Sequence, residues 1–242
     1  MQAFRAFNCG YALNKDDSFD THQQNLVWQL LGDTPITAES VVLDVGCAIG
    51  GPLGWVIDRY HPRRAIGIEY SDFNVRNAGQ IWRDKPGAPR FVQADAQRLP
   101  VATGSVDVLI NLESALHYPN KPAFLAECRR VLRPNGWLCL GDITGRMIPP
   151  VGMLAGVFQE GVHLYRPGQY EKAFRTAGLN VVRHQNVTGR VSRSLNWSLR
   201  KVEKLPRSEW AGVRTRVRYL RMLQTCFFFR WLGYDLYAAR PV

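Results

Sequence analysis

The stretch that decides the fold runs from Val41 to Gly51 and reads VVLDVGCAIGG. Its first five residues form an apolar run interrupted only by Asp44, which is typical of a parallel strand buried on both faces. The glycines that follow let the backbone turn sharply and approach a ligand closely. A helix that starts here would point its N-terminus at that ligand. The stretch therefore predicts a strand, a glycine-rich turn and a helix in succession.

The same alternation continues outward from this stretch. Its spacing indicates a parallel sheet with right-handed crossovers. Apolar residues at 21–31 are spaced as on one face of a helix, which predicts a helix before residues 41–51. The expected strands are 41–45, 65–69, 90–94, 106–110, 136–140, 178–182 and 234–239, and the expected helices are 51–60, 72–83, 121–132, 151–160 and 169–176.

Composition narrows the class of protein. The chain has 242 residues, 46% of them hydrophobic, which excludes wholesale disorder. Its five cysteines are an odd number without CxxC pairs or zinc spacing, so we expect reduced thiols and no metal site. No apolar run has the length of a signal peptide or a membrane span, which favours a cytoplasmic protein.

Three carboxylates follow or end three successive expected strands. Asp44, Glu69 and Asp95 would therefore meet at the carboxyl edge of the sheet, where open α/β sheets bind ligands. A carboxylate at position 69 can accept both hydroxyls of a ribose, and one at position 95 can accept an adenine amino group. Instead of binding a ligand, Asp44 and Asp95 could serve to cap the N-termini of helices. The glycine turn alone would serve a nicotinamide-dependent oxidoreductase equally well.

With these residues in place, the chain resembles the class I S-adenosylmethionine-dependent methyltransferases. The resemblance is clearest over residues 41–142. It implies S-adenosylmethionine as cofactor and an α/β, Rossmann-like sheet of seven strands, mostly parallel with an antiparallel last strand. One departure is Ala48, where the family usually has glycine. The elements that carry the likeness are 43–50, 67–69, 93–96 and the LRPNGW stretch at 132–137, which is specific to this superfamily among Rossmann-like folds.

The resemblance also implies domain limits and residue roles. Residues 1–40 would form an N-terminal helical cap, and 41–242 the cofactor domain with substrate-lid insertions at about 143–178 and 189–233. Gly46 and Gly50 would line the methionine part of the cofactor, with Asn111 nearby, while Glu69 holds the ribose and Asp95 with Ala96 faces the adenine. The full set expected to bind the cofactor is Tyr11, Asp44, Gly46, Cys47, Gly50, Glu69, Tyr70, Asp95, Ala96 and Asn111.

A narrower likeness concerns residues 8–11 and 113–119, which read NCGY and ESALHYP. Both look like small-molecule O-methyltransferases of natural-product, sugar and lipid biosynthesis, in which Tyr11 would close over the cofactor. An alcohol acceptor must lose its proton, and His117 has the ordinary pKa of a base at neutral pH. Asp142, at the end of the neighbouring strand, is expected to orient it. Glu113 is equally well explained as a structural acid or a substrate contact.

The net charge of +11 is concentrated in one segment. Residues 190–221 contain ten Lys or Arg against two Glu, a net charge of +8. A solvated helical face explains this most simply; an anionic membrane surface or an acidic substrate would also suit it. The stretch NLES at 111–114 lacks the Asn/Asp-Pro-Pro-aromatic element of enzymes that methylate base amines, which argues against nucleic acid.

These observations favour an O-methyltransferase acting on a small, largely apolar molecule. A C- or N-methyltransferase of the same fold is the first alternative, because an amine or an activated carbon needs no histidine base. A non-catalytic module that only binds S-adenosylmethionine is the second. The oligomeric state and the identity of the acceptor are left open by the sequence.

Overall fold

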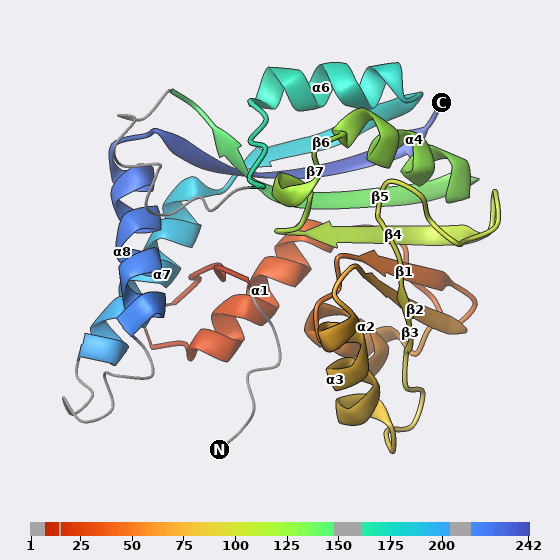
Figure 1. Cartoon of the computed structure of the whole chain (residues 1–242), viewed down its shortest axis with the longest axis horizontal. Coiled ribbons are helices and arrows are strands. Elements are labelled where there is room, and N and C mark those ends of the chain that lie inside the picture. The colour runs from red at the N-terminus through yellow and green to blue at the C-terminus, as the bar shows by residue number, and fades with distance from the viewer. Residues whose placement is uncertain (1–7, 15, 148–160, 204–213) are drawn as a thin grey trace.

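The computed structural model describes residues 8–14, 16–147, 161–203 and 214–242. A seven-stranded sheet in the order β3-β2-β1-β4-β5-β7-β6 forms its centre (Figure 1). The strands are β1 (Val41–Val45), β2 (Arg64–Glu69), β3 (Arg90–Gln93), β4 (Val106–Leu112), β5 (Leu132–Gly145), β6 (Leu179–Asn186) and β7 (Leu232–Pro241). The helices are α1 (Phe19–Leu31), α2 (Gly51–Tyr60), α3 (Asp72–Trp82), η1 (Ala115–His117, a 3₁₀ turn), α4 (Lys121–Val131), α6 (Pro167–Thr176), α7 (Thr188–Glu203) and α8 (Arg214–Phe228).

Strands β1 to β5 pair in parallel, and β7 runs antiparallel between β5 and β6. The prediction of a mostly parallel, seven-stranded Rossmann-like sheet with an antiparallel last strand is therefore confirmed. Every parallel strand ends at the same edge, so the loops after β1, β2, β3 and β4 meet there.

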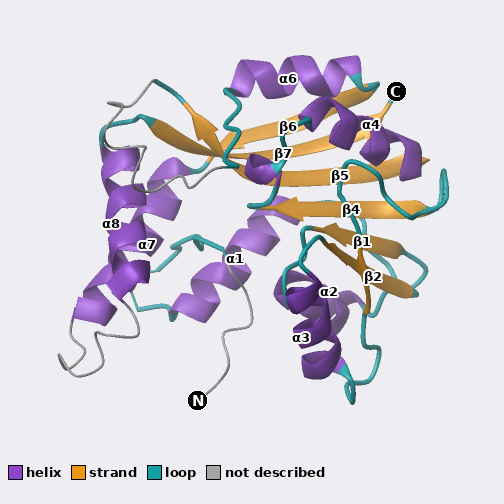
Figure 2. Cartoon of the chain, viewed as in Figure 1, coloured by secondary structure: helices purple, strands orange, loops and turns teal. Residues whose placement is uncertain are grey.

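Helices cover both faces of the sheet, as Figure 2 shows. Val42 packs into the core beneath α1, α2, α7 and α8, whereas Leu43 and Val45 pack into the core beneath α4 and α6. Side chains alternate across a strand, so a strand covered on both faces is apolar at nearly every position. All five residues of β1 are buried, which explains the apolar run at 41–45.

Some boundaries differ from the sequence prediction. Strand β5 begins at Leu132, not at residue 136, because Leu132 already pairs with Val106 before the register shifts. The LRPNGW stretch therefore lies within β5 and not before it. Gly178 has a φ of 73°, outside the extended region, so β6 begins at Leu179. The expected helix at 151–160 falls outside the described residues.

The basic segment folds as helices α7 and α8, inserted between β6 and β7. Apolar side chains of both helices, among them Val191, Leu195 and Leu223, are buried in the core that they share with α1. This arrangement brings the N-terminal helix and the insertion to the same side of the sheet. None of the helices in the described ranges is long and apolar enough to cross a membrane.

Two glycines, Gly54 in α2 and Gly79 in α3, allow a test of how tightly these helices pack. A Cβ on Gly54 would lie 2.0 Å from the Trp82 ring, whose indole N–H donates to the Ile49 carbonyl at 2.9 Å. We expect Gly54→Ala to lower the free energy of unfolding by about 1–3 kcal/mol, because the rigid ring must move. Gly79→Ala in α3 meets no atom within 4 Å and should raise stability by about 0.5–1 kcal/mol. Urea unfolding of both variants checks this; equal effects would contradict the packing.

Candidate active site

The loop after β1 is a tight turn held against β2. The backbone N–H groups of Gly46 and Cys47 both donate to the Ile68 carbonyl, at 2.8 and 3.0 Å. Gly46 has a φ of 76°, and a Cβ there would lie 1.7 Å from Ser114 Oγ, so this position has room for glycine alone. Ala48 also has a positive φ, of 50°, which explains why glycine is the usual residue there.

Glu69 joins this loop to the start of α3. Its carboxylate accepts hydrogen bonds from the backbone N–H groups of Ala48 and Ser71, both at 2.9 Å. A carboxylate has about four lone-pair sites, so each oxygen can still accept a hydrogen bond from a ligand. The side chain lines a cavity. It can therefore fix the loop and hold two ligand hydroxyls at the same time.

That cavity, of about 1020 Å³, runs along the carboxyl edge of the sheet. One end is polar and is bordered by the glycine loop and the ends of β2 and β3. The other end lies beneath α1, α7 and α8 and is bordered by Phe19, Ile143, Leu195, Tyr219 and Leu220. Ligand pockets are typically about 300–1,000 Å³, so this one can hold a nucleoside cofactor together with a second molecule.

The predicted cofactor residues divide into two groups. Those that line the cavity are Gly46, Glu69, Tyr70, Asp95 and Ala96. Asp95 caps no helix, because a turn at residues 96–98 follows it. Its Oδ1 accepts hydrogen bonds from the backbone N–H of Gln97 at 2.8 Å and from the side-chain amide of Gln97. The other five, Tyr11, Asp44, Cys47, Gly50 and Asn111, do not border it.

Two of these five form a buried polar layer behind the loop. Asn111 donates to the Val45 carbonyl at 2.8 Å and to Tyr118 Oη at 3.1 Å. Asp44 Oδ2 and Asn111 Oδ1 are buried without a hydrogen-bond partner among the described residues. Burial, with the nearby charge of Glu69, raises the pKa of Asp44 to about 7. Acceptors left without donors at this edge suit a ligand that brings N–H groups or positive charge.

The remaining three predicted cofactor residues, Tyr11, Cys47 and Gly50, do not border the cavity. Gly50 is the N-cap of α2, and the Cys47 thiol is buried facing Gly67. Tyr11 was expected to close over the cofactor. In this structure its ring instead lies under the Arg190 guanidinium, 5.9 Å away, and its N–H donates to the His22 carbonyl.

His117 and Asp142 do not form the expected pair. His117, at the end of η1, borders the cavity, and its backbone N–H donates to the Ser114 carbonyl at 3.0 Å. Asp142 is fully buried and accepts the hydroxyl hydrogen bond of Tyr170 at 2.5 Å. Burial lowers the pKa of His117, so the ring is neutral and able to accept a proton at neutral pH.

Glu113 is the cavity residue that sequence reasoning left undecided. Its backbone φ is 51°, and its carboxylate accepts the Cys9 N–H at 2.7 Å and the Tyr234 hydroxyl at 2.8 Å. Burial raises its pKa, against the effect of these donors. The link between Glu113 and Cys9 spans 104 residues, so no local pattern could have revealed it. Groups of His, Cys, Asp or Glu able to hold a metal ion are absent from the described part of the chain.

The raised pKa of Asp44 predicts how stability depends on pH. The folded carboxyl titrates near 7 and an ordinary one near 3.8, so the folded state binds this proton more tightly. The contribution of Asp44 to the free energy of unfolding is therefore fully present below about pH 4, and it is lost as the pH rises to about 7. Asp44→Asn should exceed wild type in stability by about 4 kcal/mol at pH 8 and match it to within about 1 kcal/mol at pH 4. Thermal unfolding across this range, with exposed Asp84→Asn as control, checks it; a pH-independent difference would contradict it.

The geometry agrees with comparisons to known proteins. Residues 43–140 match a methyltransferase domain family. The chain is 37% identical over 102 residues to a phthiotriol/phenolphthiotriol dimycocerosates methyltransferase of Mycobacterium leprae (strain TN), covering 42% of this chain and 37% of the relative. It is 34% identical over 130 residues to methyltransferase GfsG of Streptomyces halstedii, covering 51% of this chain and 45% of the relative. The chain thus spans less than half of each relative's length.

A solved structure shares the fold over nearly the whole chain. The cyclopropane synthase MmaA2 from Mycobacterium tuberculosis superposes with a TM-score of 0.86 at 17% identity, covering 97% of this chain and 90% of that one. The family match falls on β1 to β5, the strands that carry the glycine loop, Glu69 and Asp95. The chain therefore matches the methyltransferases over residues 43–140 and has, over nearly its whole length, the class I fold of S-adenosylmethionine-dependent methyltransferases.

Proposed function

We propose that this protein transfers the methyl group of S-adenosylmethionine to the hydroxyl of a small, largely apolar molecule, a lipid or natural product. The observation that carries this proposal is the single cavity with two unlike ends. Its polar end has the donors and acceptors of a nucleoside site, and its other end is walled by apolar and aromatic side chains. The relative named as a phthiotriol/phenolphthiotriol dimycocerosates methyltransferase supports an acceptor of this kind.

The residues at the polar end fit the cofactor. Glu69 has the spare lone pairs for two ribose hydroxyls, and Asp95 with Ala96 lies where an adenine would face the end of β3. The unpartnered oxygens of Asp44 and Asn111 suit the ammonium end of the methionine part. When bound, S-adenosylmethionine supplies an electrophilic methyl group on a sulfonium.

His117 is the residue that we assign to proton removal from the acceptor. It borders the cavity between the two ends, and its pKa is lowered, so its neutral form is available. A neutral imidazole has one ring nitrogen that can accept a proton. A base positioned in this way typically contributes about 10²–10⁴-fold in rate.

C-methylation is the second candidate, and Glu113 is the observation that favours it. Methyl transfer to an alkene needs no prior deprotonation, but it creates a positive charge on carbon and requires a proton to leave afterwards. A buried carboxylate that borders the cavity could stabilise that charge and accept that proton. The fold shared with a cyclopropane synthase is consistent with this chemistry.

Cofactor binding tests the role of Glu69. We expect S-adenosylhomocysteine to bind wild type with a micromolar Kd, about −8 kcal/mol, and NAD(H) not to bind. Glu69→Gln should weaken binding at least tenfold, because the amide cannot accept both the loop N–H groups and the ribose hydroxyls. Exposed Glu39→Gln should bind as wild type. Calorimetry measures all four; an unmoved melting temperature with saturating cofactor would reject the domain's proposed role.

The acceptor chemistry is tested at His117. For an alcohol acceptor, His117→Ala should lower kcat about 10²–10⁴-fold and abolish the acid limb of the pH–rate profile, while the affinity for S-adenosylhomocysteine is unchanged. The control is His61→Asn, at the far end of α2 from the cavity. Mass spectrometry of product made with deuterated methyl donor shows whether oxygen or carbon is labelled. Near-full activity of His117→Ala, with activity lost in Glu113→Gln, would favour C-methylation.

A further inference from the structure

Helix α8 has two different faces. Tyr219 and Leu220 border the cavity, and Leu223 and Phe227 are buried in the core. On the outer side, residues 218, 221, 225, 228 and 229 fall within an arc of about 100° around a helix of 3.6 residues per turn. This outer side is not covered by the domain, because Arg218, Arg221 and Phe228 are exposed.

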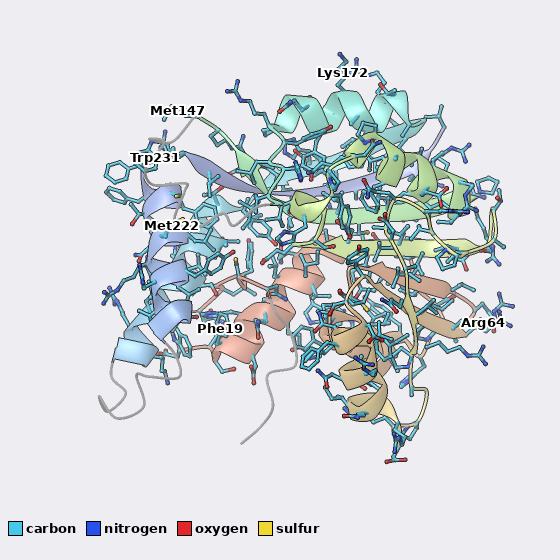
Figure 3. All side chains as sticks on the ribbon, viewed as in Figure 1. Phe19, Arg64, Met147, Lys172, Met222 and Trp231 are labelled. Carbon is cyan, nitrogen blue, oxygen red and sulfur yellow. The ribbon has the colours of Figure 1, made fainter. Side chains whose placement is uncertain are left out.

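The C-terminal end of this outer side carries an apolar cluster that we call the aromatic tip: Met147, Phe228, Phe229 and Trp231. Phe228 is 77% exposed, Met147 54% and Phe229 52%. Their contacts make them one patch, since the Phe229 ring lies 5.2 Å from that of Phe228 and stacks on Trp231 at 4.9 Å. Met147 N–H donates to the Trp231 carbonyl, and Figure 3 labels both residues near the end of α8.

The surroundings of the aromatic tip are positively charged. Between residues 214 and 233 the sequence contains five arginines and no acidic residue. Arg218 and Arg230 are exposed and form no ion pair with a described residue. Exposed aromatic side chains beside arginines, on a helix without acids, are typical of segments that lie on an anionic bilayer surface.

We propose that the aromatic tip and the arginines beside it dock this protein on an anionic lipid bilayer. The aromatic side chains would enter the headgroup region, while Arg218 and Arg230 contact lipid phosphates. An acidic protein partner would use the same charge but gives no reason for two adjacent, largely exposed phenylalanines. The proposal concerns binding alone, so it does not depend on the acceptor or on catalysis. Because α8 also borders the cavity, docking would place that wall next to the membrane.

Vesicle co-sedimentation of the full chain tests the proposal. We expect binding to vesicles of phosphatidylcholine with 30% phosphatidylglycerol that is at least tenfold stronger than to phosphatidylcholine alone, and that weakens as salt is raised. The double variant Phe228→Ser/Phe229→Ser should bind at least tenfold more weakly. Arg218→Gln/Arg230→Gln should lose most of the preference for the anionic lipid.

Matched controls lie on the opposite side of the molecule. Phe73 and Ile81 on α3 are 68% and 42% exposed, so Phe73→Ser/Ile81→Ser removes comparable apolar surface. Exposed Arg64 and Arg90, at the far edge of the sheet, give the charge control Arg64→Gln/Arg90→Gln. Both should bind vesicles as wild type. An unchanged melting temperature and unchanged binding of S-adenosylhomocysteine establish that each variant is folded.

Depth of insertion gives an independent readout. Brominated lipid should quench the fluorescence of wild type, and Trp231→Phe should lose most of that quenching. The proposal is overturned if wild type does not bind anionic vesicles, if the phenylalanine variant binds as wild type, or if the two controls lose binding equally. Binding of an acidic carrier protein through the same arginines, without vesicle binding, would also overturn it.

Discussion

The site depends on the hydrogen bonds that tie the loop after β1 to the end of β2. The Ile68 carbonyl accepts from Gly46 and Cys47, and the Glu69 carboxylate accepts from Ala48. Together they hold a turn that includes two positive φ angles, which an isolated peptide would rarely adopt. Because the polar end of the cavity is built on this turn, the positions of the other groups at this end depend on it.

The second constraint is the burial of charge on the α4 side of the sheet. Burial raises the pKa of Asp142 and lowers that of Lys121, and each charge partly offsets the shift of the other. Lys121 is fully buried, with its ammonium donating to the carbonyls of Tyr118 and His163. Asp142 thus belongs to a layer with Lys121 and Tyr170 that supports the loop carrying His117. Its expected contact with the imidazole is replaced by this role.

The insertion between β6 and β7 supplies one end of the cavity. Helices α7 and α8 share a core with α1, and the three together close the end of the cavity that the sheet leaves open. The cofactor end is built from the domain that matches a family model, whereas this end is built outside it. Under the proposed function, we therefore expect α1 and the insertion to select the acceptor.

The sequence by itself determined the alternation of strands and helices and the carboxyl edge with its glycine turn, and the family resemblance implied the seven-stranded sheet. Apolar runs at β1 and β4, the glycine turn and Glu69 are local patterns, since each depends on strand burial or backbone conformation within a few residues. The tertiary structure decided the rest. The pairing of Asp142 with Tyr170, the contact of Glu113 with Cys9 and the position of Tyr11 under Arg190 join residues 28, 104 and 179 positions apart. Such contacts depend on how helices and strands pack, and a linear pattern of residue types does not encode which side chains will meet.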